Sequence, residues 1–182
     1  QSRWAEINYQ APAAEKEKDF AKLSAQAATM VRQDPAAELL IWQGIILSTY
    51  AGAKGGLGAL DLVKQAKDSL EQAIKVDPAA LDGSAFTSLG ALYYQVPGWP
   101  VGFGDDEQAE VLLKKALTMN PDGIDPNYFY GDYLAREKRY SEAKVVLEKA
   151  LAAADRPGRE VADEGRRAEA KALLAKVQSE LD

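Results

Sequence analysis

Three segments of the chain share one spacing of small and apolar residues. In each segment an alanine stands four positions before a leucine, and a second alanine stands three positions after it. The three sets are Ala66, Leu70 and Ala73; Ala109, Leu113 and Ala116; and Ala143, Leu147 and Ala150. Residues three and four positions apart lie on the same face of a helix. Because a proline follows each segment and ends a helix, the pattern predicts three helices whose small residues let another helix approach closely.

A second apolar segment precedes each of these helices and carries a single glycine near its middle. The glycines are Gly44, Gly90 and Gly131. Glycine inside a helix costs roughly 1 kcal/mol relative to alanine. Its return at the same place in three segments indicates close contact between two helices of one unit.

The same patterns predict helices over residues 14–33, 36–51, 57–76, 80–95, 105–119, 125–138, 140–154 and 161–181. No alternating pattern typical of strands is present. We therefore expect an all-α fold of antiparallel helix pairs, in one domain over residues 1–182. We divide it into an N-terminal helix or half-repeat at 14–35, repeats at 36–78, 80–121 and 125–157, and a C-terminal capping helix at 159–182. The capping helix should bury Val161, Ala168, Ala172, Leu173 and Val177 and keep its other face charged, as a stack of repeats needs at its end.

The paired pattern resembles the tetratricopeptide repeat, through Leu89-Gly90-x2-Tyr93, through Tyr130-Gly131-x2-Leu134 and through Tyr140 before the next helix. The resemblance implies a right-handed superhelix whose first helices line a concave groove, and a non-enzymatic scaffold that binds a protein or peptide. The implied groove residues are Glu38, Ile41, Ile45 and Ser48; Ser84, Thr87, Ala91 and Tyr94; and Asp125, Tyr128 and Asp132, with Ala135 or Arg136. They lack the lysine and asparagine set with which some members of the family hold the terminal carboxylate of a peptide.

A less specific resemblance connects the chain with exported repeat proteins that accompany bacterial tripartite solute transporters. It implies an alternative function, the binding of a small apolar ligand as an accessory of such a transporter. It also implies a periplasmic or otherwise exported protein, with a cytoplasmic one as the alternative.

Composition excludes several classes of function. The chain has 22 Lys and Arg against 28 Asp and Glu, a net charge of −6, so we expect no nucleic-acid partner. It has no histidine and no cysteine, which removes the commonest general base and the commonest metal ligands. We therefore expect no metal, no cofactor and no enzymatic activity. No apolar run approaches the roughly 20 residues that cross a bilayer. The sequence leaves open whether the protein forms a homo-oligomer.

Aromatic and charged residues around one loop are the candidate binding residues. The loop, residues 93–106, is rich in proline, glycine and aromatic residues. Together with the third unit it supplies Tyr93, Tyr94, Trp99, Phe103, Tyr128, Asp132 and Arg136. Two interpretations of the loop are open: a plug of the core formed by Trp99, or an aromatic wall beside the groove with Tyr94 and Tyr128 as neighbours of Trp99.

Three further features concern charged residues. Asp105 or Asp106 is expected to cap the helix that follows, and Asp125 is expected to cap the next one with Pro126 at its first position. Arginines gather near the C-terminus, at Arg156, Arg159, Arg166 and Arg167. They are consistent with surface salt bridges to nearby acids such as Asp163 and Glu169, or with a paired arginine site for an anionic partner.

Overall fold

The computed structural model describes residues 1–182 and consists of helices joined by short loops, without a strand. The helices are α1 (Ser2–Tyr9), α2 (Ala13–Gln33), α3 (Ala37–Lys54), α4 (Gly58–Val76), α5 (Ala80–Gln95), α6 (Asp106–Met119), α7 (Ile124–Arg136), α8 (Tyr140–Ala152) and α9 (Glu160–Ser179). The all-α prediction is confirmed. Each of the eight predicted helices is present, with its ends within one helical turn of the expected positions.

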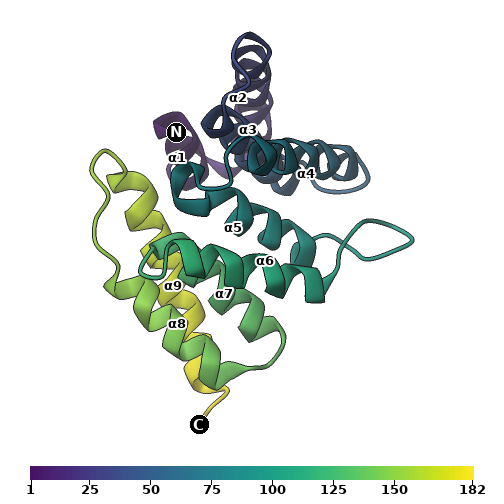
Figure 1. Cartoon of the computed structure of the whole chain (residues 1–182). Coiled ribbons are helices and arrows are strands. Elements are labelled where there is room, and N and C mark those ends of the chain that lie inside the picture. The colour runs from purple at the N-terminus through teal and green to yellow at the C-terminus, as the bar shows by residue number, and fades with distance from the viewer.

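Helices that follow one another in sequence pack against each other, and the odd-numbered helices form an additional inner row. Contacts join α3 to α5, α5 to α7 and α7 to α9, besides those between sequential helices. In Figure 1 the pairs follow one another from α3 and α4 in the upper part, through α5 and α6, to α7 and α8 below. This arrangement is a stack of helix pairs of the tetratricopeptide type, with the predicted first helix of each repeat on the inside.

The glycines and leucines of the repeated pattern meet in every pair. A Cβ atom added to Gly44 would lie 2.5 Å from Cγ of Leu70, and one added to Gly90 would lie 2.8 Å from Cγ of Leu113. The third pair repeats this contact between Gly131 and Leu147, at 2.7 Å. The nine small and apolar residues of the pattern are all fully buried, with an exposed fraction of 0%: Ala66, Leu70, Ala73, Ala109, Leu113, Ala116, Ala143, Leu147 and Ala150. The predicted close approach of the two helices is confirmed.

One helix was not predicted from the sequence. α1 buries Trp4, Ala5 and Ile7, and it packs against both α2 and α9. The ring of Tyr9 lies against Gly165 of α9 so closely that no Cβ atom would fit there. The first and last helices of the chain are therefore in contact.

The predicted buried face of the capping helix is partly wrong. Ala168 and Ala172 are exposed, whereas Ala162 and Ala170 are buried together with the correctly predicted Val177. The reason is that α9 packs against α1 and α7 as well as α8, which rotates the buried surface away from the expected stripe.

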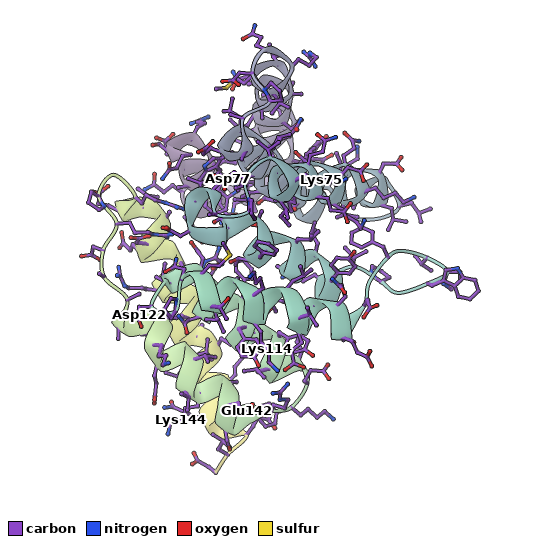
Figure 2. The ribbon with its side chains drawn as sticks, viewed as in Figure 1. Lys75, Asp77, Lys114, Asp122, Glu142 and Lys144 are labelled. Carbon is purple, nitrogen blue, oxygen red and sulfur yellow. The ribbon has the colours of Figure 1, made fainter.

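The outer helices carry exposed charged residues. Lys75, Lys114 and Glu142 are exposed and project from α4, α6 and α8 (Figure 2). On this face Glu110 accepts hydrogen bonds from Arg139 at 2.7 Å and from Tyr130 at 3.2 Å, which joins α6 to α7 and to the turn before α8. None of the helices is both long and apolar enough to span a membrane.

Candidate binding pocket

The inner surface contains a pocket of about 390 Å³. Helices α1, α2, α3, α5, α7 and α9 line it, and the outer helices α4, α6 and α8 contribute nothing. The lining residues are Trp4, Asn8, Lys16, Phe20, Trp42, Ile45, Ser48, Thr49, Gly52, Ala53, Leu81, Ser84, Thr87, Ser88, Ala91, Leu92, Gln95, Asp125, Phe129, Arg159 and Arg166. The inner row of helices and α2 thus form the wall of the pocket, and α1 and α9, which pack against each other, both contribute to it.

Several residues of the predicted groove line this pocket. They are Ile45, Ser48, Ser84, Thr87, Ala91 and Asp125. The other predicted groove residues, Glu38 among them, do not line it; for example, Ile41 is fully buried in the core and Tyr94 packs against Tyr133 with ring centroids 5.8 Å apart. The helical stripe therefore predicts the middle of the pocket but not its ends.

An aromatic wall, which the sequence did not reveal, forms the N-terminal end of the pocket. The rings of Trp4 and Trp42 lie 5.9 Å apart, and Phe20 is buried beside them in the same cluster. Nε1 of Trp4 donates a hydrogen bond to Oγ1 of Thr49 at 2.9 Å. This bond satisfies the only polar group of the indole ring and fixes the wall in place.

A left-handed turn shapes the start of α5. Leu81, Asp82 and Gly83 have φ angles of 48°, 55° and 76°. Gly83 packs against the side chain of Met119, and Leu81 lines the pocket. The regular part of α5 that carries Ser84, Thr87 and Ser88 begins directly after this turn.

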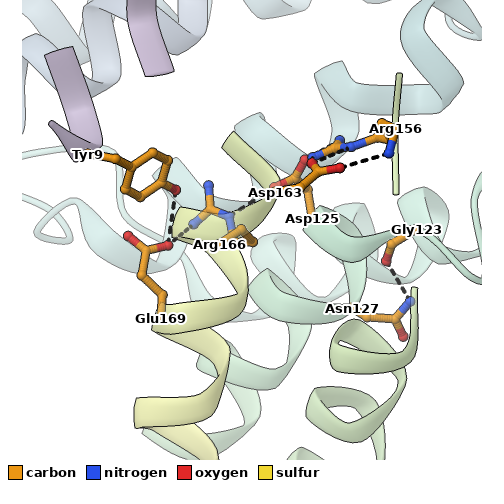
Figure 3. Close-up of polar contacts among 8 residues, drawn as sticks. All are labelled: Tyr9, Gly123, Asp125, Asn127, Arg156, Asp163, Arg166 and Glu169. Carbon is orange, nitrogen blue, oxygen red and sulfur yellow. Dashed lines mark hydrogen bonds and ion pairs between the residues drawn. The ribbon is translucent and has the colours of Figure 1, made fainter. Parts of the chain in front are cut away.

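A network of arginines and carboxylates forms the charged end of the pocket (Figure 3). Asp125 on α7 accepts a hydrogen bond from Nη1 of Arg156 at 2.7 Å and from Nε of Arg166 at 2.9 Å. Arg156 also donates to the buried carboxylate of Asp163, and Arg166 donates to Glu169 at 2.6 Å. Burial acts to raise the pKa of Asp125, but Arg166 and Arg156 outweigh it, and the pKa lies below its ordinary value. Asp125 is therefore held as a carboxylate between two guanidinium groups.

Two predictions about these charged residues are wrong. Asp125 does not cap a helix, because α7 begins at Ile124 with Gly123 before it, and the side chain of Asn127 donates to the carbonyl oxygens of Pro121 and Gly123 at 2.8 Å. Nor does the arginine cluster form surface salt bridges only. Arg166 and Asp163 are buried, and they have carboxylate and guanidinium partners in the interior. By contrast, Asp105 caps α6 as expected, with its Oδ1 accepting from the backbone N–H of Gln108 at 2.9 Å.

Arg159 differs from the other arginines of the network. It precedes α9 and lines the pocket, but it forms no ion pair. Its Nε atom is buried and has no hydrogen-bond partner. Its guanidinium carbon lies 5.5 Å from the ring centroid of Trp42, a cation–π contact that orients the side chain. Burial, together with the charge of Arg156, lowers the pKa of Arg159.

The candidate residues chosen from the sequence fall into separate places. Tyr94, Asp132 and Arg136 lie together: the hydroxyl of Tyr94 donates to Asp132 at 2.8 Å, and the guanidinium of Arg136 lies 4.9 Å from the ring centroid of Tyr94. Tyr128 lies under Arg166, whose guanidinium carbon is 4.6 Å from its ring centroid. Burial raises the pKa of Tyr128 to about 12. None of these four residues lines the pocket.

The loop between α5 and α6 projects from the body of the molecule (Figure 1). At its base Phe103 packs edge-on against Tyr93, with ring centroids 5.5 Å apart. Trp99 is 89% exposed and has no aromatic neighbour, so the interpretation as a core plug is wrong, as is the expected contact with Tyr94 and Tyr128. Backbone bonds hold the shape of the loop, from Gly104 to Pro97 at 2.9 Å and from Asp105 to Tyr93 at 2.8 Å.

Comparison with known proteins supports the repeat architecture. Residues 102–163 match a family model described as tetratricopeptide repeat. The matched segment covers α6, α7 and α8 and the start of α9, which includes the third predicted repeat. The match confirms the predicted resemblance in this part of the chain. No curated protein matches the sequence.

Proposed function

We propose that this tetratricopeptide repeat chain is a non-enzymatic interaction module that takes a peptide segment of a partner protein into the pocket of its inner surface. The repeat is in general a scaffold for protein interaction, and solenoids of this kind present a concave binding surface. One observation carries the proposal further: a cavity of about 390 Å³ is lined by the inner helices of all three predicted repeats.

The lining suits a peptide. Along α5 the pocket offers the hydroxyl groups of Ser84, Thr87 and Ser88 and the amide of Gln95. Such groups donate and accept hydrogen bonds to a peptide backbone, whereas the partly exposed Trp42 and Ile45 provide apolar contact for a side chain. Polar groups fix the orientation of a bound segment, and the apolar wall supplies most of the binding energy.

The exposed loop adds a second contact surface to this proposal. Trp99 and Val101 are exposed at its tip, and the backbone bonds within the loop reduce the entropy that binding would cost. Tryptophan is enriched among the residues that dominate binding energy at interfaces. We assign Trp99 to a folded part of the same partner, with Tyr93 and Phe103 as the support of the loop.

The proposal is tested by selection of peptides from a random library displayed on phage, followed by measurement of their affinity. Ser88 lines the pocket and forms no side-chain hydrogen bond, so Ser88→Trp fills the pocket, and Ser88→Ala is the matched control. Selected peptides should bind the wild type and Ser88→Ala alike and lose binding to Ser88→Trp. Peptides that bind Ser88→Trp as tightly as the wild type would show that the pocket is not their site.

A second candidate is the binding of a small apolar ligand, in an exported protein that accompanies a solute transporter. The size of the cavity favours it, because pockets for small molecules measure about 300–1,000 Å³. Extraction of the protein purified from its native source, followed by mass spectrometry, tests this candidate. A stoichiometric small molecule in the extract supports it, and its absence from protein that binds selected peptides counts against it.

A further inference from the structure

The charges in the pocket have the opposite sign to the charge of the whole chain. The lining contains three cationic side chains, Lys16, Arg159 and Arg166, and one carboxylate, Asp125. The chain as a whole has a net charge of −6. The other members of the network, Arg156, Asp163 and Glu169, lie outside the pocket lining, where the two carboxylates pair with Arg156 and Arg166. The pocket is therefore a local positive site in an acidic protein, and it favours an anionic group.

Only one of the two arginines in the lining has carboxylate partners. Arg166 donates to Asp125 at 2.9 Å and to Glu169 at 2.6 Å. Arg159 has no carboxylate partner, although its side chain borders the same cavity. A guanidinium group has five N–H donors in a planar fork, and the terminal amino groups of Arg159 form no hydrogen bond within the protein, so they are available to a bound molecule.

The environment of Arg159 makes an empty site costly and a bound carboxylate favourable. Its buried Nε has no hydrogen-bond partner, and a buried donor without a partner destabilises the structure. The neighbouring Arg156 adds to the cost through like-charge repulsion. A carboxylate accepts two parallel N–H bonds from a guanidinium group, so one acidic group would satisfy Arg159 and offset this repulsion.

The position of Trp42 indicates which kind of side chain should lie next to the acidic group in a bound segment. Arg159 lies over the ring of Trp42, which packs against Trp4 in the aromatic wall. A carboxylate on Arg159 therefore stands directly beside an apolar surface. The polar side chains of α5, such as Ser84 and Thr87, extend along the pocket and offer partners for a backbone that continues past the acidic group.

We infer that the partner segment carries an acidic side chain that binds Arg159 and, within a few residues of it, an apolar side chain that packs on Trp4 and Trp42. This inference rests on the proposed function and names the chemistry of its ligand. The acidic group belongs to a side chain inside the segment rather than to the end of a chain, because polar residues line the pocket beyond it.

The test uses peptides displayed through their C-termini, so that no terminal carboxylate is free. Peptides selected on the wild-type protein should share an acidic residue close to an aromatic or aliphatic one. Affinity is then measured by fluorescence anisotropy for a selected peptide and for its analogue with Asp→Asn or Glu→Gln, on the wild type and on Arg159→Gln. Each single change should weaken binding by about tenfold or more, and both changes together should weaken it little further.

Two further variants complete the design. Arg32→Gln is the matched control, because Arg32 is exposed on α2 and contacts only Thr29 of its own helix, and it should bind the peptide as the wild type does. Arg159→Lys keeps the charge but not the planar fork, so it should retain part of the affinity. Thermal melts of all variants verify that they are folded.

The outcomes separate this inference from the proposed function. If no selected peptide is sensitive to Ser88→Trp, the proposed function fails. If Ser88→Trp abolishes binding but the peptides lack an acidic residue, or bind Arg159→Gln as tightly as the wild type, the inference is overturned and the proposed function stands. The inference would also be overturned if the peptide change and Arg159→Gln weakened binding independently, so that their effects on the binding free energy added up. It would be overturned as well if a free arylalkyl carboxylate bound as tightly as the selected peptide.

Discussion

The hydroxyl group of Tyr9 in α1 donates a hydrogen bond to Oε2 of Glu169 in α9 at 3.3 Å, although the two residues are 160 positions apart. The same carboxylate accepts a hydrogen bond from Arg166. Burial raises the pKa of Tyr9 well above its ordinary value, so the hydroxyl remains a donor at every physiological pH. The contact between the first and last helices is thus connected directly to the charged end of the pocket.

Docking of α1 should contribute strongly to stability. Ile7 is 1% exposed and lies in the cluster that α1 shares with α2, α3 and α9. Ile7→Ala should lower the free energy of unfolding by about 2–5 kcal/mol, the usual cost of such a truncation. Arg3→Ala, at an exposed position of the same helix, is the control and should change little. Urea denaturation measures both, and an unchanged midpoint for Ile7→Ala would mean that α1 is not docked in solution.

Two glycines of α3 should respond to alanine in opposite directions. At Gly44 the new Cβ would meet Leu70, whereas at Gly52 it meets nothing within 4 Å. Overpacking costs about 1–3 kcal/mol, which exceeds the gain of roughly 1 kcal/mol in helix propensity. Gly44→Ala should therefore lower the midpoint of thermal unfolding, and Gly52→Ala should raise it. Equal shifts would contradict the close approach of α3 and α4.

The two arginines in the pocket lining should differ in their effect on stability. Arg166→Gln leaves the carboxylate of Asp125 with one partner fewer in the interior, and breaking such a pair costs about 3–5 kcal/mol. Arg159→Gln removes a buried donor that has no partner and a single cation–π contact, so the net change should stay below about 1 kcal/mol. Chemical denaturation of both variants checks the difference. Comparable losses would show that Arg159 has a structural partner in solution.

The loss of folding stability at acidic pH should depend in part on Glu110. Its hydrogen bonds with Arg139 and Lys114 lower its pKa from 4.5 to about 2. A folded-state pKa below the unfolded value gives a stabilisation that is complete above about pH 4.5 and is lost as the pH falls towards about 2. Glu110→Gln should therefore reduce the pH dependence of the unfolding midpoint in this window. A variant whose profile parallels that of the wild type would rule out this contribution.

Trp99→Ala should separate binding from stability. The side chain is 89% exposed, so its removal should leave the melting temperature nearly unchanged. If the loop contacts a partner as proposed, the affinity for that partner should fall by about tenfold or more, as for other interface tryptophans. The measurement pairs a thermal melt with a titration of the identified partner protein. Unaltered affinity would remove Trp99 from the interface.

The helices and their pairing follow from local spacing, and this is why they were predictable. The contact of Gly131 with Leu147 needs only the register of two neighbouring helices, which the alanine and leucine pattern already encodes. α1 was missed for the opposite reason. A helix of eight residues is marginal by itself, and its burial of Trp4 and Ile7 depends on contacts with α9 at the far end of the chain. The spacing of these two apolar residues was the only available signal.

Pocket residues could be predicted from the sequence only where the periodicity of a single helix places them on the inner surface. The stripe of α5 correctly places Ser84 and Thr87 on the inner surface. The density of aromatic residues in the sequence does not indicate the pocket, because neither Tyr94 nor Trp99 lines it. The rings that do line the pocket, such as Trp42, stand in ordinary helical segments, where no local feature distinguishes a cavity wall from core.

The contact between α1 and α9 restricts the number of repeats that this fold can contain. An open solenoid can gain or lose a unit with little effect on the others, because each unit contacts only its neighbours. Here an inserted helix pair would move α9 away from α1 and separate Tyr9 from Glu169. Because the first and last helices are in contact, the number of helix pairs between them determines how much space the inner helices surround. If the pocket binds a segment of a partner as proposed, the space for it would depend on the number of repeats as well as on the residues of the wall.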